Sequence, residues 1–128
     1  MPYAKSLVQI LTEALRQKST VTAVQFETLM LSRRVKRGEL RVVEAAKSRK
    51  EDDGVSVGSY YRVLDQARSR LERSIFTLLL AVRTQTLDKD ELIRLLTMVS
   101  EAPEQMGEAN LQEFNDLLVA LVRKMVVI

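Results

Sequence analysis

The residues that could perform acid–base chemistry are all carboxylates, and they stand in two clusters. Asp52 and Asp53 lie in a highly charged loop, and Asp88, Asp90 and Glu91 lie at a predicted helix start. A carboxylate stabilises a helix N-terminus whatever the protein does. The chain has no Cys and no His, which excludes thiol nucleophiles and removes the commonest general base. With no phosphate-binding Gly loop, nucleophile elbow or metal-ligand spacing, we expect no enzyme, no cofactor and no metal.

Residues 54–64, GVSVGSYYRVL, indicate a different chemistry, which is binding through the start of a helix. Gly54 permits a tight turn, Val55 is an apolar plug, and Ser56 is a typical N-cap. If the helix begins at Val57, its periodicity divides the following residues between two faces. The inward face is predicted to hold Tyr60, Val63, Leu64 and Ala67, and the outward face residues 57, 58, 61 and 62.

This stretch resembles the second half of the helix-turn-helix in repressors and sigma-like factors, whose pattern runs G-V-S-x-x-T-V-x-R-x-L. Ser59 and Tyr60 take the T-V positions, and Arg62 takes the basic position. Upstream, RVVEAAK resembles the first helix of such a pair, with Ala45 and Ala46 small where the helices would cross. The resemblance covers residues 40–64 and implies a tri-helical DNA-binding core in which the helix after Ser56 reads the DNA.

The spacing within this match departs from the family pattern. The small residue usually stands four positions before the Gly, whereas Ala46 precedes Gly54 by eight. The surplus equals about one α-helical turn. Either the first helix runs a turn longer or the loop between the helices is open.

The resemblance and the basic residues together define the predicted DNA contacts. Gly58 permits close approach of the helix N-terminus to a phosphate. Arg62 offers the most discriminating contact, because an arginine can donate two hydrogen bonds to guanine. The predicted set is completed by Ser56, Val57, Ser59 and Tyr61 on the same helix, and by Arg33, Arg34, Lys36, Arg37, Arg41, Lys47, Arg49 and Lys50 as phosphate contacts.

Charge is distributed unevenly along the 128 residues, although the net charge is only +3. Residues 1–84 hold 16 Lys and Arg against 9 Asp and Glu, and residues 85–128 hold 4 against 8. Such asymmetry indicates a part that binds a polyanion beside a part that avoids one. We therefore divide the chain into a basic, helix-turn-helix-like DNA-binding region (1–84) and an acidic helical assembly region (85–128).

Apolar periodicity predicts an all-α protein: a tri-helical helix-turn-helix core continued by a long central helix and C-terminal helices, together a helical bundle. Capping signals set the helix starts, at Ser6, Thr22, Ser56, Asp88 and Asn110. Gly38 is expected to end the second helix. The predicted helices span residues 6–17, 22–37, 39–50, 57–83, a segment from 88 and a segment from 110.

Two functions fit these features. The first is a double-stranded DNA-binding protein, either a transcriptional regulator or a chromosome- or plasmid-associated factor, acting as a homodimer through residues 70–128. The dimer seam would be the apolar last helix or the Leu64–Leu71–Leu78 line. The second is a helical adaptor that binds another protein without specific DNA binding. No signal peptide or membrane span is indicated, so a cytoplasmic location is expected.

Overall fold

The computed structural model describes residues 7–50, 53–104 and 106–127, and these form six α helices. No strand occurs in these ranges, so the chain is all-α as predicted. The helices are α1 (Leu7–Lys18), α2 (Ala23–Lys36), α3 (Val42–Lys47), α4 (Val57–Arg83), α5 (Lys89–Ser100) and α6 (Glu108–Met125). The capping signal expected at Ser6 lies outside the described residues.

The chain packs as two compact units. The three-helix unit is Arg16–Ser74, and the terminal unit combines Met1–Leu15 with Ile75–Ile128. The boundary therefore falls inside α4, whereas the sequence suggested a division between residues 84 and 85. The suggested division was drawn from charge composition. The compact units are instead determined by the apolar helix faces that pack together.

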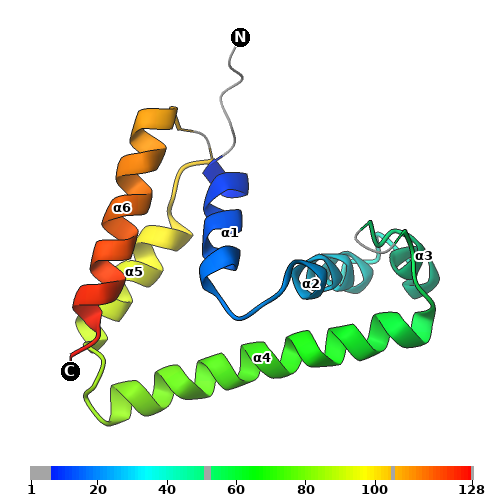
Figure 1. Cartoon of the computed structure of the whole chain (residues 1–128), viewed down its shortest axis with the longest axis horizontal. Helices are drawn as coiled ribbons and strands as arrows, with labels where there is room; N and C mark the ends of the chain where they lie inside the picture. The colour runs from blue at the N-terminus through cyan, green and yellow to red at the C-terminus, as the bar shows by residue number, and fades with distance from the viewer. Residues whose placement is uncertain (1–6, 51–52, 105, 128) are drawn as a thin grey trace. The chain divides into compact units, whose positions relative to one another are not determined.

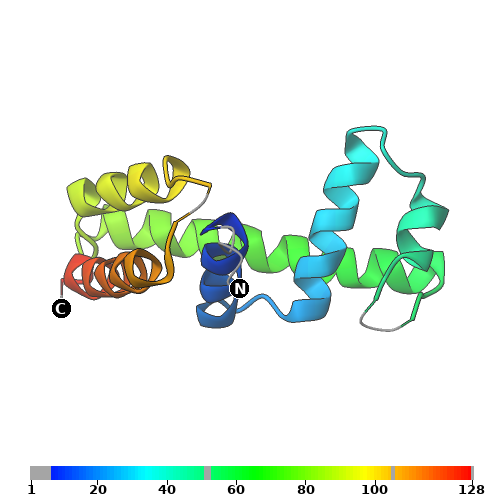
Figure 2. The ribbon, with the colours of Figure 1, turned by 90° about the horizontal axis from the view of Figure 1, so that it is seen from above.

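The three-helix unit is built from α2, α3 and the first half of α4. In Figures 1 and 2, α2 crosses α4, and α3 lies beside the start of α4. Buried Leu31 of α2, Ala45 and Ala46 of α3, and Tyr60 and Leu64 of α4 form the core. The two alanines are less than 2% exposed, so the small side chains let the helix backbones approach closely. The Arg70 guanidinium also donates a hydrogen bond to the Thr20 carbonyl.

Local sequence signals predict the ends of α2 correctly, but they do not predict the extent of α3. The capping box at the start of α2 is confirmed, because Thr22 Oγ1 accepts from Gln25 N–H at 3.1 Å and Gln25 Oε1 accepts from Thr22 N–H at 3.1 Å. Gly38 follows α2 with a positive φ of 77°. By contrast, α3 spans only Val42–Lys47, not the predicted residues 39–50.

The connection between α3 and α4 is open, which was one of the two alternatives for the long spacing. Because α3 already ends at Lys47 and α4 begins at Val57, the extra turn of chain lies in the loop and not in the helix. Two backbone hydrogen bonds hold this loop in its folded-back conformation. Val55 N–H donates to the Ala46 carbonyl at 3.0 Å, and Gly54 N–H donates to the Arg49 carbonyl at 2.7 Å.

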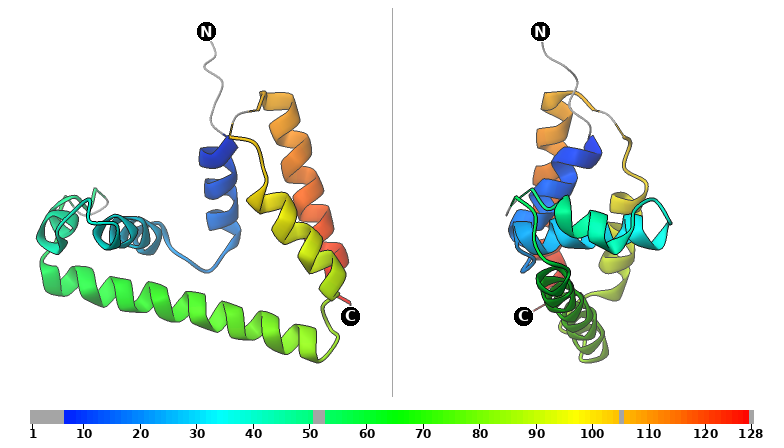
Figure 3. Two further views of the ribbon diagram at one scale, coloured as in Figure 1. Left: turned by 180° about the vertical axis from the view of Figure 1, so that it is seen from behind. Right: turned by 90° about the vertical axis from the view of Figure 1, so that its right-hand side faces the viewer.

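The terminal unit packs the start of α1 and the end of α4 with α5 and α6, which lie side by side (Figure 3). Its buried core is Leu11, Leu87, Leu95, Leu111, Leu118 and Met125. Asp88 caps α5 as predicted, accepting from Asp90 N–H at 2.9 Å and from Glu91 N–H at 3.1 Å. The last helix begins earlier than predicted, at Glu108 after Gly107, and Gly107 makes no side-chain cap.

Backbone hydrogen bonds hold the last described residues against the link before α5. Asp88 N–H donates to the Met125 carbonyl at 2.9 Å, and Val127 N–H donates to the Thr86 carbonyl at 2.8 Å. The side chains of Val126 and Val127 are nevertheless 45% and 56% exposed. The apolar end of the chain is thus fixed by its backbone and does not need burial of these side chains to be ordered.

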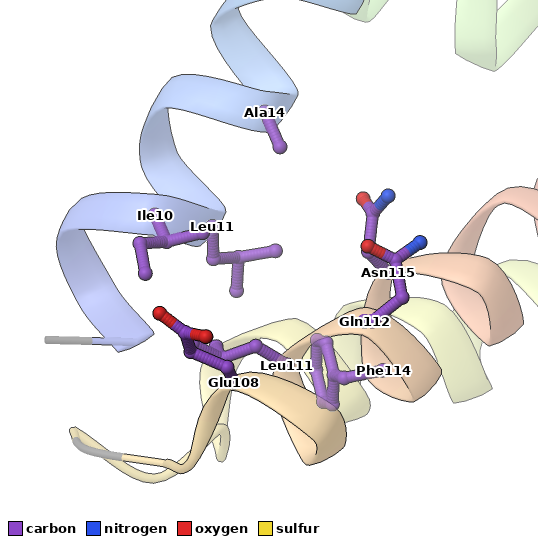
Figure 4. Close-up of a pocket in the computed structure, with 8 residues that line it drawn as sticks. All are labelled: Ile10, Leu11, Ala14, Glu108, Leu111, Gln112, Phe114 and Asn115. Atoms are coloured by element: carbon purple, nitrogen blue, oxygen red, sulfur yellow. The ribbon is translucent and has the colours of Figure 1, made fainter. Parts of the chain in front are cut away.

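A cavity of about 340 Å³ lies between α1 and α6 within the terminal unit. Ile10, Leu11 and Ala14 line it from α1, and α6 contributes Leu111 and Phe114. Figure 4 shows the side-chain amides of Gln112 and Asn115 rising from α6 toward α1. The cavity indicates that these two helices pack loosely along this part of their contact.

Several apolar residues of the terminal unit are exposed. Leu96, Leu117 and Val122 are 59%, 52% and 44% exposed, because only one face of α5 and of α6 meets the rest of the unit. In the apolar run Ile75–Val82 of the long central helix, residues 75–80 are all exposed. None of the helices in the described part of the chain has the length and apolarity to cross a membrane.

Candidate nucleic-acid interface

The start of α4 is positioned by three consecutive residues. Gly54 has a φ of 91°, and a Cβ at this position would lie 3.2 Å from the Lys47 carbonyl oxygen. Val55 packs against the core of the three-helix unit. Ser56 Oγ accepts from the Ser59 backbone N–H at 3.1 Å and so caps the helix, as predicted. These contacts place the end of α3 directly before the first turn of α4.

The inward face of α4 is fixed by burial. Tyr60, Leu64 and Ala67 are 1%, 3% and 0% exposed, which confirms the predicted inward face for these three residues. Burial raises the pKa of the Tyr60 hydroxyl above its ordinary value, so it stays neutral throughout the physiological range. The ring of Tyr61 meets that of Tyr60 edge-on, with ring centroids 5.6 Å apart. Rotation of α4 about its axis would expose these buried side chains. The face of α4 that points to solvent is therefore fixed.

The outward face of the first two turns differs in part from prediction. Gly58, Tyr61 and Arg62 are exposed, and Tyr61 is 45% exposed. Val57 was expected to face outward, but it packs against the core, because its position one turn before Tyr60 and two turns before Leu64 brings it toward the inward face. Ser59 is half-buried. The exposed residues available to a partner are therefore Ser56, Gly58, Tyr61 and Arg62.

Sequence reasoning missed Asp65, which is exposed on α4. It follows Arg62 by three positions and Tyr61 by four, so it shares their helix face. This spacing is visible in the sequence and could have identified it. A carboxylate here repels phosphates and can accept a hydrogen bond from the amino group of cytosine. At a nucleic-acid interface Asp65 would therefore favour contact with base edges over contact with the phosphate backbone.

The basic residues form two groups, one before α3 and one after it. Arg33, Arg34, Lys36 and Arg37 are exposed at the end of α2, and Lys47 and Lys50 are exposed at the end of α3. The backbone contact between Lys47 and Gly54 brings the second group to the start of α4. The Lys47 backbone thus lies beside Gly54, two residues before Ser56, while the first group precedes α3 along the chain.

Two of the predicted phosphate contacts are engaged by neighbouring carboxylates. Arg34 Nε lies 3.3 Å from Glu39 Oε2, and Arg41 Nε lies 2.8 Å from Glu44 Oε1. The hydrogen bond from Arg41 lowers the pKa of Glu44, which is exposed. Partial neutralisation makes these two arginines weaker phosphate ligands than Arg33, Lys36 and Arg37, for which no carboxylate partner is found within the described residues.

Arg49 does not belong to the interface. Its side chain is 2% exposed, and its Nε lies 3.6 Å from Oε1 of Glu27 on α2. A phosphate could reach this guanidinium only if the core opened. Its prediction as a phosphate contact is therefore corrected: Arg49 holds the loop after α3 against α2.

Comparison with protein-family models, with curated proteins and with solved structures found no match to this chain. The chemistry of the site must therefore be inferred from its own residues. Among the described residues, no group of three or more acids is placed to hold a metal ion.

Proposed function

We propose that the three-helix unit binds double-stranded DNA and that α4 enters the major groove by its first two turns. The observation that carries the proposal is the division of α4 into two faces. Tyr60, Leu64 and Ala67 are buried on one face, which leaves Tyr61 and Arg62 exposed on the other. A helix held in this way presents the same few side chains to every partner, which reading of base edges requires.

The exposed cations supply the affinity. Lys47 ends α3, where its backbone contacts Gly54, and Lys50 follows in the loop that leads to α4. Arg33, Lys36 and Arg37 lie at the end of α2. Each cation that neutralises a phosphate releases a condensed counterion, so the binding is expected to weaken steeply with salt. In this account the cations position the unit on the duplex, while Arg62 and Asp65 discriminate among base pairs.

We further propose that the protein is a homodimeric transcriptional regulator or chromosome- or plasmid-associated factor, with the acidic terminal unit as its assembly module. Residues 85–128, which make up most of this unit, hold 4 Lys and Arg against 8 Asp and Glu and so repel phosphates. Two copies would present two reading helices to two half-sites.

The competing proposal is a helical adaptor that binds another protein. The exposed apolar side chains of the terminal unit favour it, because exposed apolar patches commonly mark protein contacts. The two proposals differ in the expected partner of the three-helix unit. An adaptor needs no preference among DNA sequences, whereas the DNA-binding protein should have one that depends on Arg62.

The test is to select binding sequences from random duplexes with the full chain and to compare Arg62→Ala with Arg123→Ala. Arg123 is an exposed cation near the end of α6, so its removal changes the net charge equally. Loss of a base contact should weaken binding to the selected sequence by about 10- to 100-fold and binding to random duplex by less than about threefold. Arg123→Ala should change neither. No enriched sequence, or equal effects of both variants, would contradict the proposal.

A further inference from the structure

The second half of α4 carries an apolar stripe that its own unit leaves uncovered. Ile75, Phe76, Leu79 and Leu80 are 56%, 69%, 59% and 65% exposed. The two residues that follow the stripe, Ala81 and Val82, pack against the core of the terminal unit. Apolar side chains this exposed and this close together are unusual on a soluble surface that has no partner.

The stripe is flanked by one acid and one base on the same helix face. Glu72 precedes Ile75 by three positions, and Arg83 follows Leu80 by three. The series 72, 75, 76, 79, 80 and 83 has the spacing of a single helix face. It covers about 17 Å along the axis at 1.5 Å per residue. Both end residues are exposed, and neither has an ion-pair partner within the described residues.

This pattern is complementary to itself only when a second copy runs antiparallel. A two-fold axis between residues 77 and 78 places Ile75 opposite Leu80 of the second copy, and Phe76 opposite Leu79. The same axis brings Glu72 of each copy to Arg83 of the other. A parallel pair would instead set Glu72 against Glu72 and Arg83 against Arg83, which costs free energy.

We infer that two copies of this chain dimerise through an antiparallel pair of α4 helices, with the Glu72–Arg83 stripe as the seam. This inference rests on the proposed homodimer and specifies its surface, and it does not depend on DNA binding. Of the two predicted seams, the Leu64–Leu71–Leu78 line loses Leu64, which is 3% exposed in the three-helix core and is not available to another subunit. The inferred seam lies on α4 and not on the last helix.

The first test compares Leu79→Asp with Leu96→Asp in the full chain, by light scattering and sedimentation velocity without DNA. Both leucines are 59% exposed, but Leu96 lies on α5, away from the stripe. Leu79→Asp should raise the dimer Kd by about 100-fold, because each dimer loses two apolar contacts and gains two buried charges. Leu96→Asp should leave the Kd within about threefold. A wild-type chain that is monomeric at about 100 μM, or equal effects of both substitutions, would overturn the seam.

The second test exchanges the charges. Glu72→Arg and Arg83→Glu should each weaken the dimer by about tenfold, and the double variant should restore wild-type affinity to within about threefold. Absence of rescue would overturn the antiparallel register. Because the chain has no Cys, mixed Phe76→Cys and Leu79→Cys chains add a direct check. The mixed disulfide should exceed both homodimeric disulfides, and excess Phe76→Cys homodimer would overturn the register. Dimerisation without DNA binding would refute the proposed DNA binding alone, and DNA binding by a monomer would refute the homodimer and its seam but not the DNA binding.

Discussion

The side chain of Arg49 is held inside the three-helix unit by Glu27, with 3.6 Å between Arg49 Nε and Glu27 Oε1. The other oxygen of the same carboxylate accepts the Lys50 backbone N–H at 2.9 Å. One acid on α2 therefore fixes two consecutive residues of the loop that leads to α4. The position of the proposed reading helix depends on this contact, although neither Arg49 nor Glu27 is part of the interface.

Replacing Arg49 by Ala should lower the free energy of unfolding of the three-helix unit by about 3 kcal/mol. The substitution leaves Glu27 without its cation and removes a large buried side chain. Urea unfolding followed by circular dichroism measures the effect. Lys50→Ala is the control, because the exposed Lys50 side chain can be removed while its backbone N–H remains, and it should change stability by less than about 0.5 kcal/mol. Equal stability of the two variants would refute a structural role for Arg49.

Gly54→Ala should destabilise the unit by about 2 kcal/mol, for two reasons. The φ of 91° is strained for any residue with a Cβ, and that Cβ would lie 3.2 Å from the Lys47 carbonyl oxygen. Gly38→Ala separates these causes, since Gly38 has a φ of 77° but a Cβ there meets nothing within 4 Å. It should cost about 1 kcal/mol. A smaller loss for Gly54→Ala than for Gly38→Ala in the same unfolding assay would contradict the close packing at Lys47.

Lys36→Ala should weaken binding to all duplexes alike and reduce the slope of log K against log salt by about one, as expected for the loss of one phosphate contact. Arg62→Ala should leave the slope of log K against log salt nearly unchanged, but it should reduce the discrimination between DNA sequences. Fluorescence anisotropy over a salt series measures both quantities. If the two variants behave identically, the division into positioning and reading residues is wrong.

Glu44→Gln should strengthen DNA binding by about two- to threefold at low salt. Glutamine can still accept the Arg41 backbone N–H that Glu44 accepts at 3.2 Å, but it no longer neutralises the Arg41 guanidinium. The freed cation adds to the attraction for phosphates. Glu113→Gln on α6 removes the same charge from the other unit and should have a smaller effect. Unchanged or weaker binding by Glu44→Gln would place Arg41 outside the interface.

Local signals in the sequence identified the parts of the fold that local contacts determine. Thr22, Ser56 and Asp88 cap helices through hydrogen bonds to residues two or three positions ahead, so their roles follow from spacing alone. The buried face of α4, with Tyr60 and Leu64, likewise follows from helical periodicity.

Contacts between distant residues could not be predicted in this way. The pairing of Arg49 with Glu27 joins the loop after α3 to α2, and a buried arginine has the same local sequence pattern as an exposed one. The short α3 depends on the bond from Val55 N–H to the Ala46 carbonyl, which exists only once the loop has folded back. The exposure of Phe76 depends on which side of α4 meets the core, and the apolar run gives no indication of this.

The most direct test of the central claim is the affinity of the wild-type chain for duplex DNA as a function of salt. If Arg33, Lys36, Arg37, Lys47 and Lys50 contact phosphates, the Kd should be micromolar or tighter at about 50 mM salt. It should then rise several hundredfold by about 200 mM, with a slope of about −4 to −5. No binding at about 50 mM, or an affinity that does not change with salt, would contradict the proposal that the three-helix unit binds DNA.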